Sequence, residues 1–530
     1  MITINLILLI ANLLLVNLFT YKIRTQAIVT LNVMGACFLI NMVNIFFIPN
    51  TKKYLSWDLK FSNLLINVNT NIELANIPFT LDKISYLFLL LTTLLTPFAL
   101  LTNWNSISIF NTKRLFFSLL LWIEIMLIIT FTTLDLFIFY LGFEGLTIPV
   151  FFLIYLYGSE ITKIRASLYF IIYSFLSSTF MALAIFIMYS QFQTTNILQL
   201  IIKYNEAIYG LVPKNKASHI WINYINTLQN FNFNTDFLVF NEIFFENTDT
   251  ILFSKDRLCL LWILLFLAFI IKLPMVPFHM WLPEAHAEAP TSGSILLTGL
   301  ILKLGGYGLY RFFIPLFGNF TYFIPLVHTL SIIGIIYIGL TCLKVNHIKQ
   351  IIAYSSIVHM NAVCLGLFTN KVISFTGAIY SMLSHSLISS CLFMMAGILY
   401  NRYQSYYIEN YSGLYYNMPV FSFFFIFILL ANIAIPLTSG FIGELLILID
   451  LSKYNLFIFL IFFTNYMVNT GYSIWLGNRL IFGDIKLNQA TNKKYINYLD
   501  LNTLEICLLS LFVTLILFFG IYPNIILPFN

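Results

Sequence analysis

Single lysines, histidines and glutamates stand inside long apolar stretches of this 530-residue chain. The deepest of them are Glu144, Lys272, Lys303, His359, His385 and Glu444. A charged side chain at the centre of a bilayer costs on the order of 3 kcal/mol, so residues of this kind are usually functional. All three residue types can take up and release a proton. Their types and positions therefore indicate proton movement through a membrane.

Lys272 lies near the middle of the apolar segment 258–282, and Pro274 follows it closely. Proline removes a backbone donor and clashes with the carbonyl four residues earlier, so we expect the helix to break beside the lysine. The freed carbonyls and the negative helix end could receive a cation. Glu144, also in the middle of an apolar segment, is the natural partner for a buried ammonium. The alternatives are a lysine that reaches the membrane surface and a purely structural ion pair.

Two histidines, His359 and His385, lie in apolar segments beside serines that could hold bridging waters. Because histidine exchanges a proton near neutral pH, we expect these two to relay protons together with Lys303. The alternative is that each ring is only hydrogen-bonded. His328 is a weaker candidate for the relay. We expect positioning or structural roles for His279 and His286.

A second apolar segment is interrupted by a proline in the same way as the segment that contains Lys272. Pro436 and nearby glycines precede Glu444 within the apolar segment 419–448. Similar breaks in corresponding segments of two halves are the best sequence indication of an ion pathway near the membrane midplane. Glu124 and Asp135 are further candidates for proton transfer, and Asp135 is expected to lie nearer the membrane surface.

The composition indicates an integral membrane protein that is all-α. Sixty per cent of the residues are hydrophobic and 9% are charged, against roughly 25% charged in soluble domains. Apolar runs of about 20 residues without alternation predict spanning helices rather than the strands of an outer-membrane barrel. We expect about fourteen spans, near residues 3–20, 27–49, 83–102, 115–133, 135–157, 166–190, 258–282, 292–313, 322–343, 350–369, 373–400, 419–448, 455–477 and 503–522.

The two interrupted spans are the seventh and the twelfth. Their offset of five, an odd number, predicts two five-helix repeats of opposite orientation, spans 4–8 and 9–13. The expected regions are an N-terminal three-helix region, a first repeat, a polar inserted loop, a second repeat and a C-terminal helix. They occupy residues 1–114, 115–190 with 257–313, 191–256, 314–480 and 481–530.

Basic residues predict the orientation of the chain. Loops after odd-numbered spans hold thirteen lysines and arginines, Lys349 among them, and short loops after even-numbered spans hold seven, including Arg311. Basic loops face the cytoplasm or the mitochondrial matrix. We therefore expect both termini on the opposite side, which in a mitochondrion is the intermembrane space.

Several stretches resemble a known family. "KLPMVPFHMWLPEAHAEAPTSGSILLTGLILKLGGYG" is very similar to the signature of the antiporter-like subunits of respiratory complex I, the proton-translocating NADH–quinone oxidoreductase. "FEGLTIP", "YSSIVHMN", "MLSHSLISS" and "GFIGELLIL" follow in the order and spacing of that family. The resemblance covers roughly residues 115–190 and 257–480. It departs from the family at Gly145, where alanine is usual, and in the 191–256 insertion.

The resemblance implies a role for each candidate residue. Separation of the Glu144–Lys272 ion pair would drive the cycle, Lys303, His359 and His385 would carry protons along the membrane plane, and Glu444 would be the terminal group. NADH, FMN, iron–sulfur clusters and quinone would be bound by other subunits. Expected partners are chains 2 and 5 of the complex, accessory subunits and membrane lipid, but not nucleic acid. The expected location is the mitochondrial inner membrane, or a bacterial plasma membrane.

The residues themselves agree with a chain that binds no redox cofactor. The six cysteines are scattered without C-x-x-C spacing, and no G-x-G-x-x-G follows a strand pattern. A different class of function remains open, a subunit of a multi-subunit sodium/proton antiporter, since such transporters share this fold. Co-purification with flavoprotein and iron–sulfur subunits would separate the two.

Overall fold

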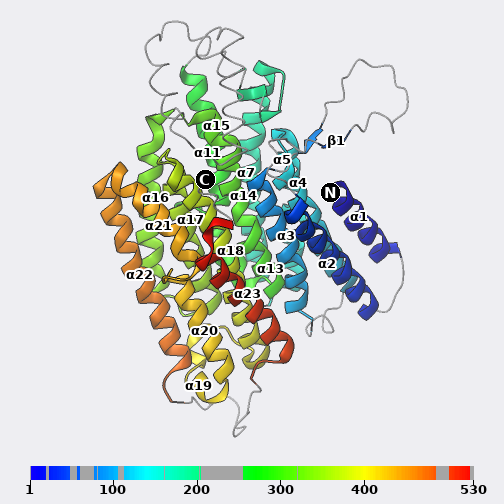
Figure 1. Ribbon diagram of the computed structural model, residues 1–530, viewed down its shortest axis with the longest axis vertical. Coiled ribbons are helices and arrows are strands. Elements are labelled where there is room, and N and C mark those ends of the chain that lie inside the picture. Colours follow the sequence, from blue (N-terminus) through cyan, green and yellow to red (C-terminus); the bar gives the residue numbers. More distant parts are fainter. Residues whose placement is uncertain are drawn as a thin grey trace.

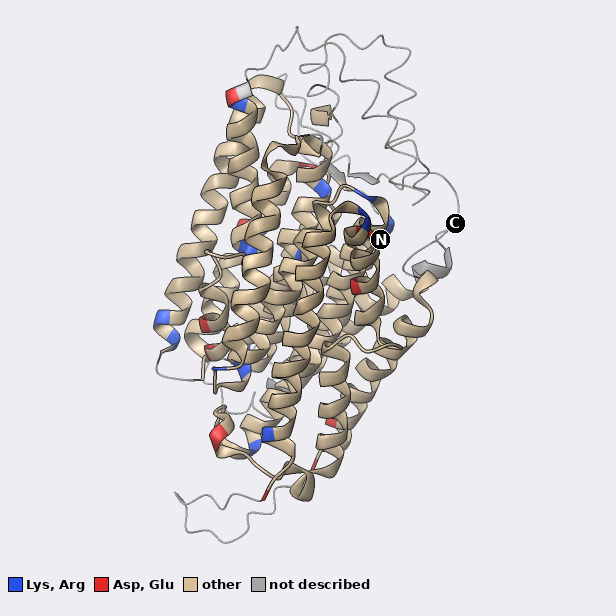
Figure 2. Cartoon of the chain, turned by 90° about the vertical axis from the view of Figure 1, so that its left-hand side faces the viewer, with Lys and Arg blue, Asp and Glu red and all other residues tan. Residues whose placement is uncertain are grey.

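A computed structural model describes residues 2–18, 23–47, 57–59, 77–79, 82–104, 113–159, 162–197, 199–201, 203, 255–318, 320–484 and 500–525. Long helices stand side by side and make up nearly all of this part of the chain (Figure 1). Lysines, arginines and acidic residues are sparse along the helices, and several lie inside the bundle (Figure 2). The predicted insertion falls mostly outside the described residues.

The first helices form one side of the bundle, with α1 and α2 at its edge (Figure 1). Their bounds are α1 Ile2–Leu18, α2 Ile23–Phe47, α3 Lys83–Thr102, α4 Lys113–Thr132, α5 Leu136–Gly145, α6 Thr147–Tyr157 and α7 Lys163–Phe192. Between α2 and α3, strands β1 (Trp57–Leu59) and β2 (Ile77–Phe79) pair antiparallel, with Asp58 opposite Pro78. This small sheet is the one departure from an all-α chain among the described residues.

The middle of the chain contains the first interrupted helix and a helix with two π-helical segments. The elements are α11 Lys255–Lys272, α12 Trp281–Glu288, α13 Thr291–Leu296, η3 Leu297–Ile301, α14 Leu302–Gly308, η4 Leu309–Phe313 and α15 Ile314–Phe317. Segments η3 and η4 are π-helical turns, which are frequent at functional sites. The sequence did not indicate them.

The remaining helices form the other side of the bundle, with α22 at its edge (Figure 1). They are η5 Thr321–Phe323, α16 Ile324–Cys342, α17 Ile348–Leu367, α18 Val372–Tyr403, η6 Ile408–Asn410, α19 Leu414–Asn417, α20 Pro419–Asn432, α21 Ser439–Tyr454, α22 Leu456–Ile481, α23 Thr503–Ile521 and η7 Pro523–Ile525.

Eleven helices among the described residues are long and apolar enough to cross a membrane. They coincide with eleven of the predicted spans. The other three predicted spans correspond to α1, to α11 with α12, and to α20 with α21, which are shorter, more polar or interrupted. The membrane-spanning character is thus confirmed, while the count of fourteen stays a prediction.

Both predicted helix breaks are present, and they use the same backbone arrangement. Pro274 cannot donate to Ile270, and the Met275 N–H donates to the Ile270 carbonyl instead, over 3.1 Å. At the second break the Ile435 N–H donates to the Leu430 carbonyl over 3.3 Å, again five residues back. At each break, this bond to the carbonyl five residues back gives a partner to a carbonyl group that the interrupted helix would otherwise leave without one.

An unpredicted break separates α5 from α6 at Leu146. Pro149 has no N–H for the Gly145 carbonyl four residues earlier, but Leu146 keeps helical backbone angles, and Val150 still donates to its carbonyl over 3.4 Å. The predicted span 135–157 therefore remains one apolar span with a one-residue interruption, and Glu144 lies just before that interruption.

The two predicted repeats contain matching connections. Helix α7 ends in left-handed Gln193 and α18 ends in left-handed Gln404, with φ of 54° and 56°. After each, an isolated backbone bridge returns to the start of an earlier helix: Asp135 with Asn196, and His347 with Tyr407. The equivalent helix ends and backbone bridges support two related repeats. The boundaries of these repeats stay a prediction.

Candidate functional site

Lys303 is fully buried in α14, directly after the π-helical segment η3. Its ammonium donates to the Thr298 carbonyl and lies 2.9 Å from Nδ1 of His385 in α18. An ammonium has three donors and no acceptor, so His385 Nδ1 accepts when Lys303 is protonated. The lysine and the histidine are therefore in direct proton-transfer contact.

His385, His359 and Glu444 continue this contact across three helices. The rings of His385 and His359 have centroids 5.2 Å apart. In turn, His359 Nδ1 in α17 lies 2.9 Å from Glu444 Oε1 in α21. The structure thus joins four of the predicted residues in one buried series: Lys303, His385, His359 and Glu444.

A small cavity adjoins the second half of this series. Its volume is about 20 Å³, counted as space open to the centres of water molecules, and its wall includes Ser384 and Asn432. Roughly 10–15 Å³ of such space holds one water. Nε2 of His359, Nε2 of His385 and Oε2 of Glu444 are buried atoms without a hydrogen-bond partner in the structure. A water here would find the polar partners it needs and could bridge the two rings.

Lys272 occupies the end of α11, and its ammonium is directed at aromatic rings. Nζ lies 4.7 Å from the ring centroid of Phe143 and 5.6 Å from that of Phe170. Within the part of the chain described, no nitrogen–oxygen contact under 4.0 Å joins Lys272 to Glu144. The predicted direct pairing is absent in this state. Phe143 precedes Glu144 in α5, and its ring stabilises the Lys272 ammonium by a cation–π contact.

At the first break, a side chain supplies a hydrogen bond to a backbone carbonyl next to Lys272. The indole of Trp281 at the start of α12 donates to the Ile271 carbonyl over 2.9 Å. A side chain from the second half-helix therefore caps the first, which fixes the position of the lysine at the break.

The two further candidates differ in their surroundings. Glu124 in α4 is fully buried, and neither carboxylate oxygen has a hydrogen-bond partner. Asp135 caps α5: its Oδ1 accepts from the backbone N–H groups of Phe137 (2.8 Å) and Ile138 (3.2 Å), and its Oδ2 accepts from the Thr195 hydroxyl (2.7 Å). The geometry gives Asp135 a structural role and leaves Glu124 as a candidate.

His328 in α16 packs its ring against Tyr454 at the end of α21, with centroids 5.4 Å apart. It has no contact with the series from Lys303 to Glu444. The structure thus does not bring His328 into the series.

Two basic residues expected in loops are instead buried. Arg311 lies in η4 and forms an ion pair with Asp82, with about 8% and 9% of the two side chains exposed. Lys349 at the start of α17 is fully buried and donates to the Ala289 carbonyl over 2.7 Å. Each residue stands at the edge of an apolar run and lies within a helix rather than in the loop beside it, because depth there depends on packing. The orientation predicted from the basic residues stays a prediction.

His286 is a buried histidine that the sequence analysis placed among structural residues. It is fully buried in α12, stacks on Phe393 of α18 at 4.9 Å, and neither ring nitrogen has a hydrogen-bond partner. The spacing of residues along the helix did not predict that His286 would be fully buried, because the break before α12 determines which face of that helix packs inside the bundle.

Metal-binding side chains do not cluster in the described ranges: no group of three or more histidines, cysteines or acidic residues lies together there. The cysteines are free. The chemistry that the contacts among Lys303, His385, His359 and Glu444 offer is proton transfer.

Comparison with known proteins identifies the family. Residues 133–468 match the family described as "NADH:quinone oxidoreductase/Mrp antiporter, TM". The chain is 38% identical over 448 residues to NADH-ubiquinone oxidoreductase chain 4 of Marchantia polymorpha, covering 84% of this chain and 79% of that protein. It is 39% identical over 445 residues to the chain 4 protein of Chondrus crispus, with the same two coverages.

Solved structures share the fold. A chain of respiratory complex I from Thermus thermophilus superimposes with a TM-score of 0.77 at 22% identity, covering 99% of this chain and 96% of that one. A chain of an archaeal membrane-bound sulfane sulfur reductase gives 0.74 at 18% identity, covering 99% and 95%. The sequence matches, together with the buried series of proton-exchanging residues, lead to one conclusion: this chain belongs to the NADH:quinone oxidoreductase/Mrp antiporter transmembrane family.

Proposed function

We propose that this chain is the proton-translocating chain 4 subunit in the membrane arm of NADH:ubiquinone oxidoreductase, in the mitochondrial inner membrane. The observation that carries the proposal is the buried series from Lys303 through His385 and His359 to Glu444, with contacts of 2.9 Å at both ends. Its relatives of 36–39% identity, all named chain 4, support the same assignment.

In this proposal Lys303 delivers a proton to His385 Nδ1, and the proton leaves from the other ring nitrogen, Nε2. A histidine that accepts on Nδ1 and releases from Nε2 passes the proton on and is left as the other neutral tautomer, so the ring must regain its first tautomer before the next transfer. A water in the adjoining cavity bridges to His359, which hands the proton to Glu444. Glu444 is then the terminal group of the lateral pathway.

In this proposal the charge state of the Lys272–Glu144 pair controls Lys303, the first group of the pathway. When the pair is apart, as here, the Lys272 ammonium rests on Phe143 and Phe170. Packing of α14 on α11 links the two lysines: a methyl group on Gly305 would lie 2.9 Å from the Phe269 carbonyl. A change of charge at Lys272 therefore acts on Lys303 through a closely packed, low-dielectric interior.

We further propose the assembly that the family implies. Electron transfer, with NADH, FMN, iron–sulfur clusters and quinone, belongs to other subunits, and chains 2 and 5, accessory subunits and lipid adjoin this chain. Both termini face the intermembrane space. Glu124 remains a second-line proton-transfer group, while the contacts of Asp135 and His328 favour structural roles.

The test uses the assembled complex reconstituted in lipid vesicles. Lys303→Met removes the ammonium at nearly constant shape, and we expect NADH-driven proton pumping to fall at least tenfold per assembled complex. Arg479→Met is the matched control, because Arg479 contacts Trp475 in α22, outside the series. Unchanged pumping with Lys303→Met would contradict the proposal. A chain that purifies without flavoprotein and exchanges protons for sodium without NADH would instead be an antiporter subunit.

A further inference from the structure

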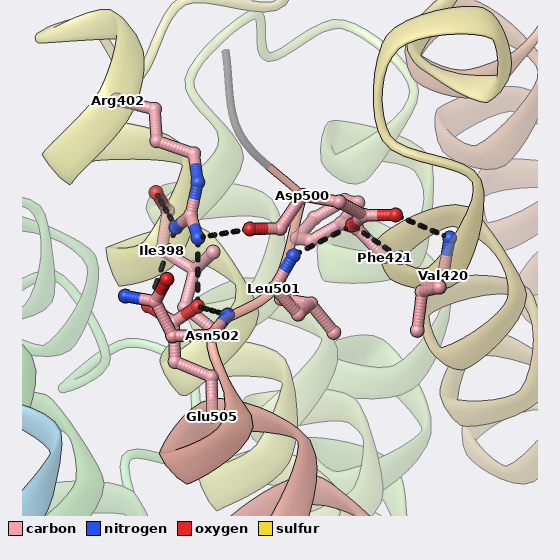
Figure 3. Close-up of polar contacts among 8 residues, drawn as sticks. All are labelled: Ile398, Arg402, Val420, Phe421, Asp500, Leu501, Asn502 and Glu505. Atoms are coloured by element: carbon pink, nitrogen blue, oxygen red, sulfur yellow. Dashed lines mark hydrogen bonds and ion pairs between the residues drawn. The ribbon is translucent and has the colours of Figure 1, made fainter.

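The last helix, α23, contacts the second interrupted helix at both of its ends. At one end, Asp500 lies just before α23 and caps α20 (Figure 3). Its Oδ2 accepts from the Val420 N–H over 2.8 Å and its Oδ1 from the Phe421 N–H over 3.1 Å. The residue before α20, Met418, offers no side-chain cap. A carboxylate from another segment therefore satisfies the first turn of the broken helix.

The start of α23 is also hydrogen-bonded to α18, the helix that contains His385. Arg402 near the end of α18 donates to both carboxylate oxygens of Glu505, over 2.7 and 3.3 Å, and to the Asp500 carbonyl over 3.0 Å (Figure 3). Glu505 also accepts from the Asn502 N–H over 2.9 Å. A bidentate arginine–carboxylate contact has a fixed geometry, so the start of α23 is oriented as well as attached.

At its other end, α23 lies directly on the break. A methyl group on Gly520 would be 2.0 Å from the Leu437 carbonyl oxygen and 2.7 Å from the Thr438 carbonyl carbon. Leu437 has a φ of +76°, which side-chain-bearing residues rarely adopt. The hydroxyl of Tyr380 in α18 donates to the neighbouring Phe519 carbonyl. The backbone of α23 at Gly520 is therefore in close contact with the strained turn at Leu437. A strained turn persists only where the surrounding structure stabilises it.

Helix α21, which begins at Ser439, is also packed closely against α18. A methyl group on Gly443 would lie 2.7 Å from the Ser381 nitrogen of α18. The next residue, Glu444, makes the 2.9 Å contact with His359. Because α23 meets the turn before α21 and α18 meets α21 at Gly443, both through close backbone contacts, a displacement of the break passes along α21 to the carboxylate.

We propose that α23 is a positioning element of the proton pathway, and that Gly520 is the residue through which it holds Glu444 within reach of His359. The inference rests on the proposed function. Ordinary van der Waals contact begins at 3.4 Å, so a methyl at position 520 would separate the two backbones by about 1 Å or more. A shift of that size in the 2.9 Å contact ends the hydrogen bond through which the proton passes.

The decisive variant is Gly520→Ala, compared with Gly471→Ala in α22, where an added methyl meets nothing within 4 Å. Both changes add one methyl to a glycine in an apolar helix. In the assembled complex in vesicles, we expect Gly520→Ala to lower NADH-driven proton pumping per complex about tenfold and to alter its pH profile, while Gly471→Ala matches the parent.

Tyr380→Phe is a second variant that keeps shape and removes one hydrogen bond to α23. We expect a smaller loss of pumping per complex, with the pH profile altered in the same direction. Wild-type pumping per complex in both Gly520→Ala and Tyr380→Phe, or fewer complexes that each pump normally, overturns the inference. If Lys303→Met then still abolishes pumping, the proposed function survives; if it too pumps normally, both are wrong.

Discussion

Replacing His385 by leucine tests the proton pathway at its centre. His385 receives the 2.9 Å contact from Lys303 Nζ, and its ring centroid lies 5.2 Å from that of His359. Without the imidazole, the separation between Lys303 and His359 exceeds the roughly 3 Å over which a proton passes between heavy atoms, and leucine fills the space that water would need. We expect proton transfer through this chain to stop.

The size of the effect follows from these contacts. Loss of a positioned proton-transfer group typically slows a step by 10²–10⁴, and the lower figure corresponds to about 2.7 kcal/mol of activation free energy. The Lys303 ammonium also loses a partner, which reduces stability by about 1–3 kcal/mol. Because leucine packs in an apolar bundle, the complex should still assemble, with turnover at least 100-fold slower in this chain.

The assay is NADH-driven acidification of vesicles that contain the assembled complex, read with a pH-sensitive dye beside the rate of quinone reduction. Ser390→Ala is the control: Ser390 is buried in the same helix but does not line the cavity, and its hydroxyl donates to the Leu387 carbonyl over 2.8 Å. We expect near-normal pumping for that variant. Full rates and an unchanged number of protons per electron pair with His385→Leu would refute the pathway.

Three further outcomes test the surroundings of the pathway. Lys272→Ala and Glu144→Ala should each lower coupled quinone reduction and pumping at least tenfold in assembled complexes, and full pumping in both would exclude the pair from the cycle. Asp135→Ala removes a helix cap and should lower stability by about 0.5–2 kcal/mol in thermal unfolding while pumping per complex is unchanged; a pumping defect would return it to the pathway. Arg311→Met leaves Asp82 as an uncompensated buried charge, a loss of about 3–5 kcal/mol, so native gels should show much less assembled complex; normal amounts would contradict this.

The sequence predicted the features that depend on single residues and local runs. Helix breaks beside Lys272 and before Glu444 follow from Pro274, Pro436 and their surroundings, because a missing N–H acts within one turn. Apolar runs likewise predicted where eleven long helices lie. Isolated ionisable residues indicated which side chains to examine, and four of them meet in one series.

Features that depend on packing between distant helices were not predictable in the same way. The Lys272 ammonium lies over the rings of Phe143 in α5 and Phe170 in α7, two helices that are far from α11 in sequence. Asp135 accepts a hydrogen bond from the Thr195 hydroxyl across 60 residues of sequence, and Asp500 caps α20 across 80. Such separations leave no periodic signal, since only the folded bundle brings the partners together.

The small cavity beside His359, His385 and Glu444 bears on which ion this chain can pass. With about 20 Å³ it has room for one or two waters. A sodium ion with several waters around it would need several times the roughly 10–15 Å³ that one water occupies on this scale, more than the cavity has in this structure. A proton moves along hydrogen bonds and needs no space of its own. The size of the cavity therefore favours transfer of a proton over passage of a hydrated cation.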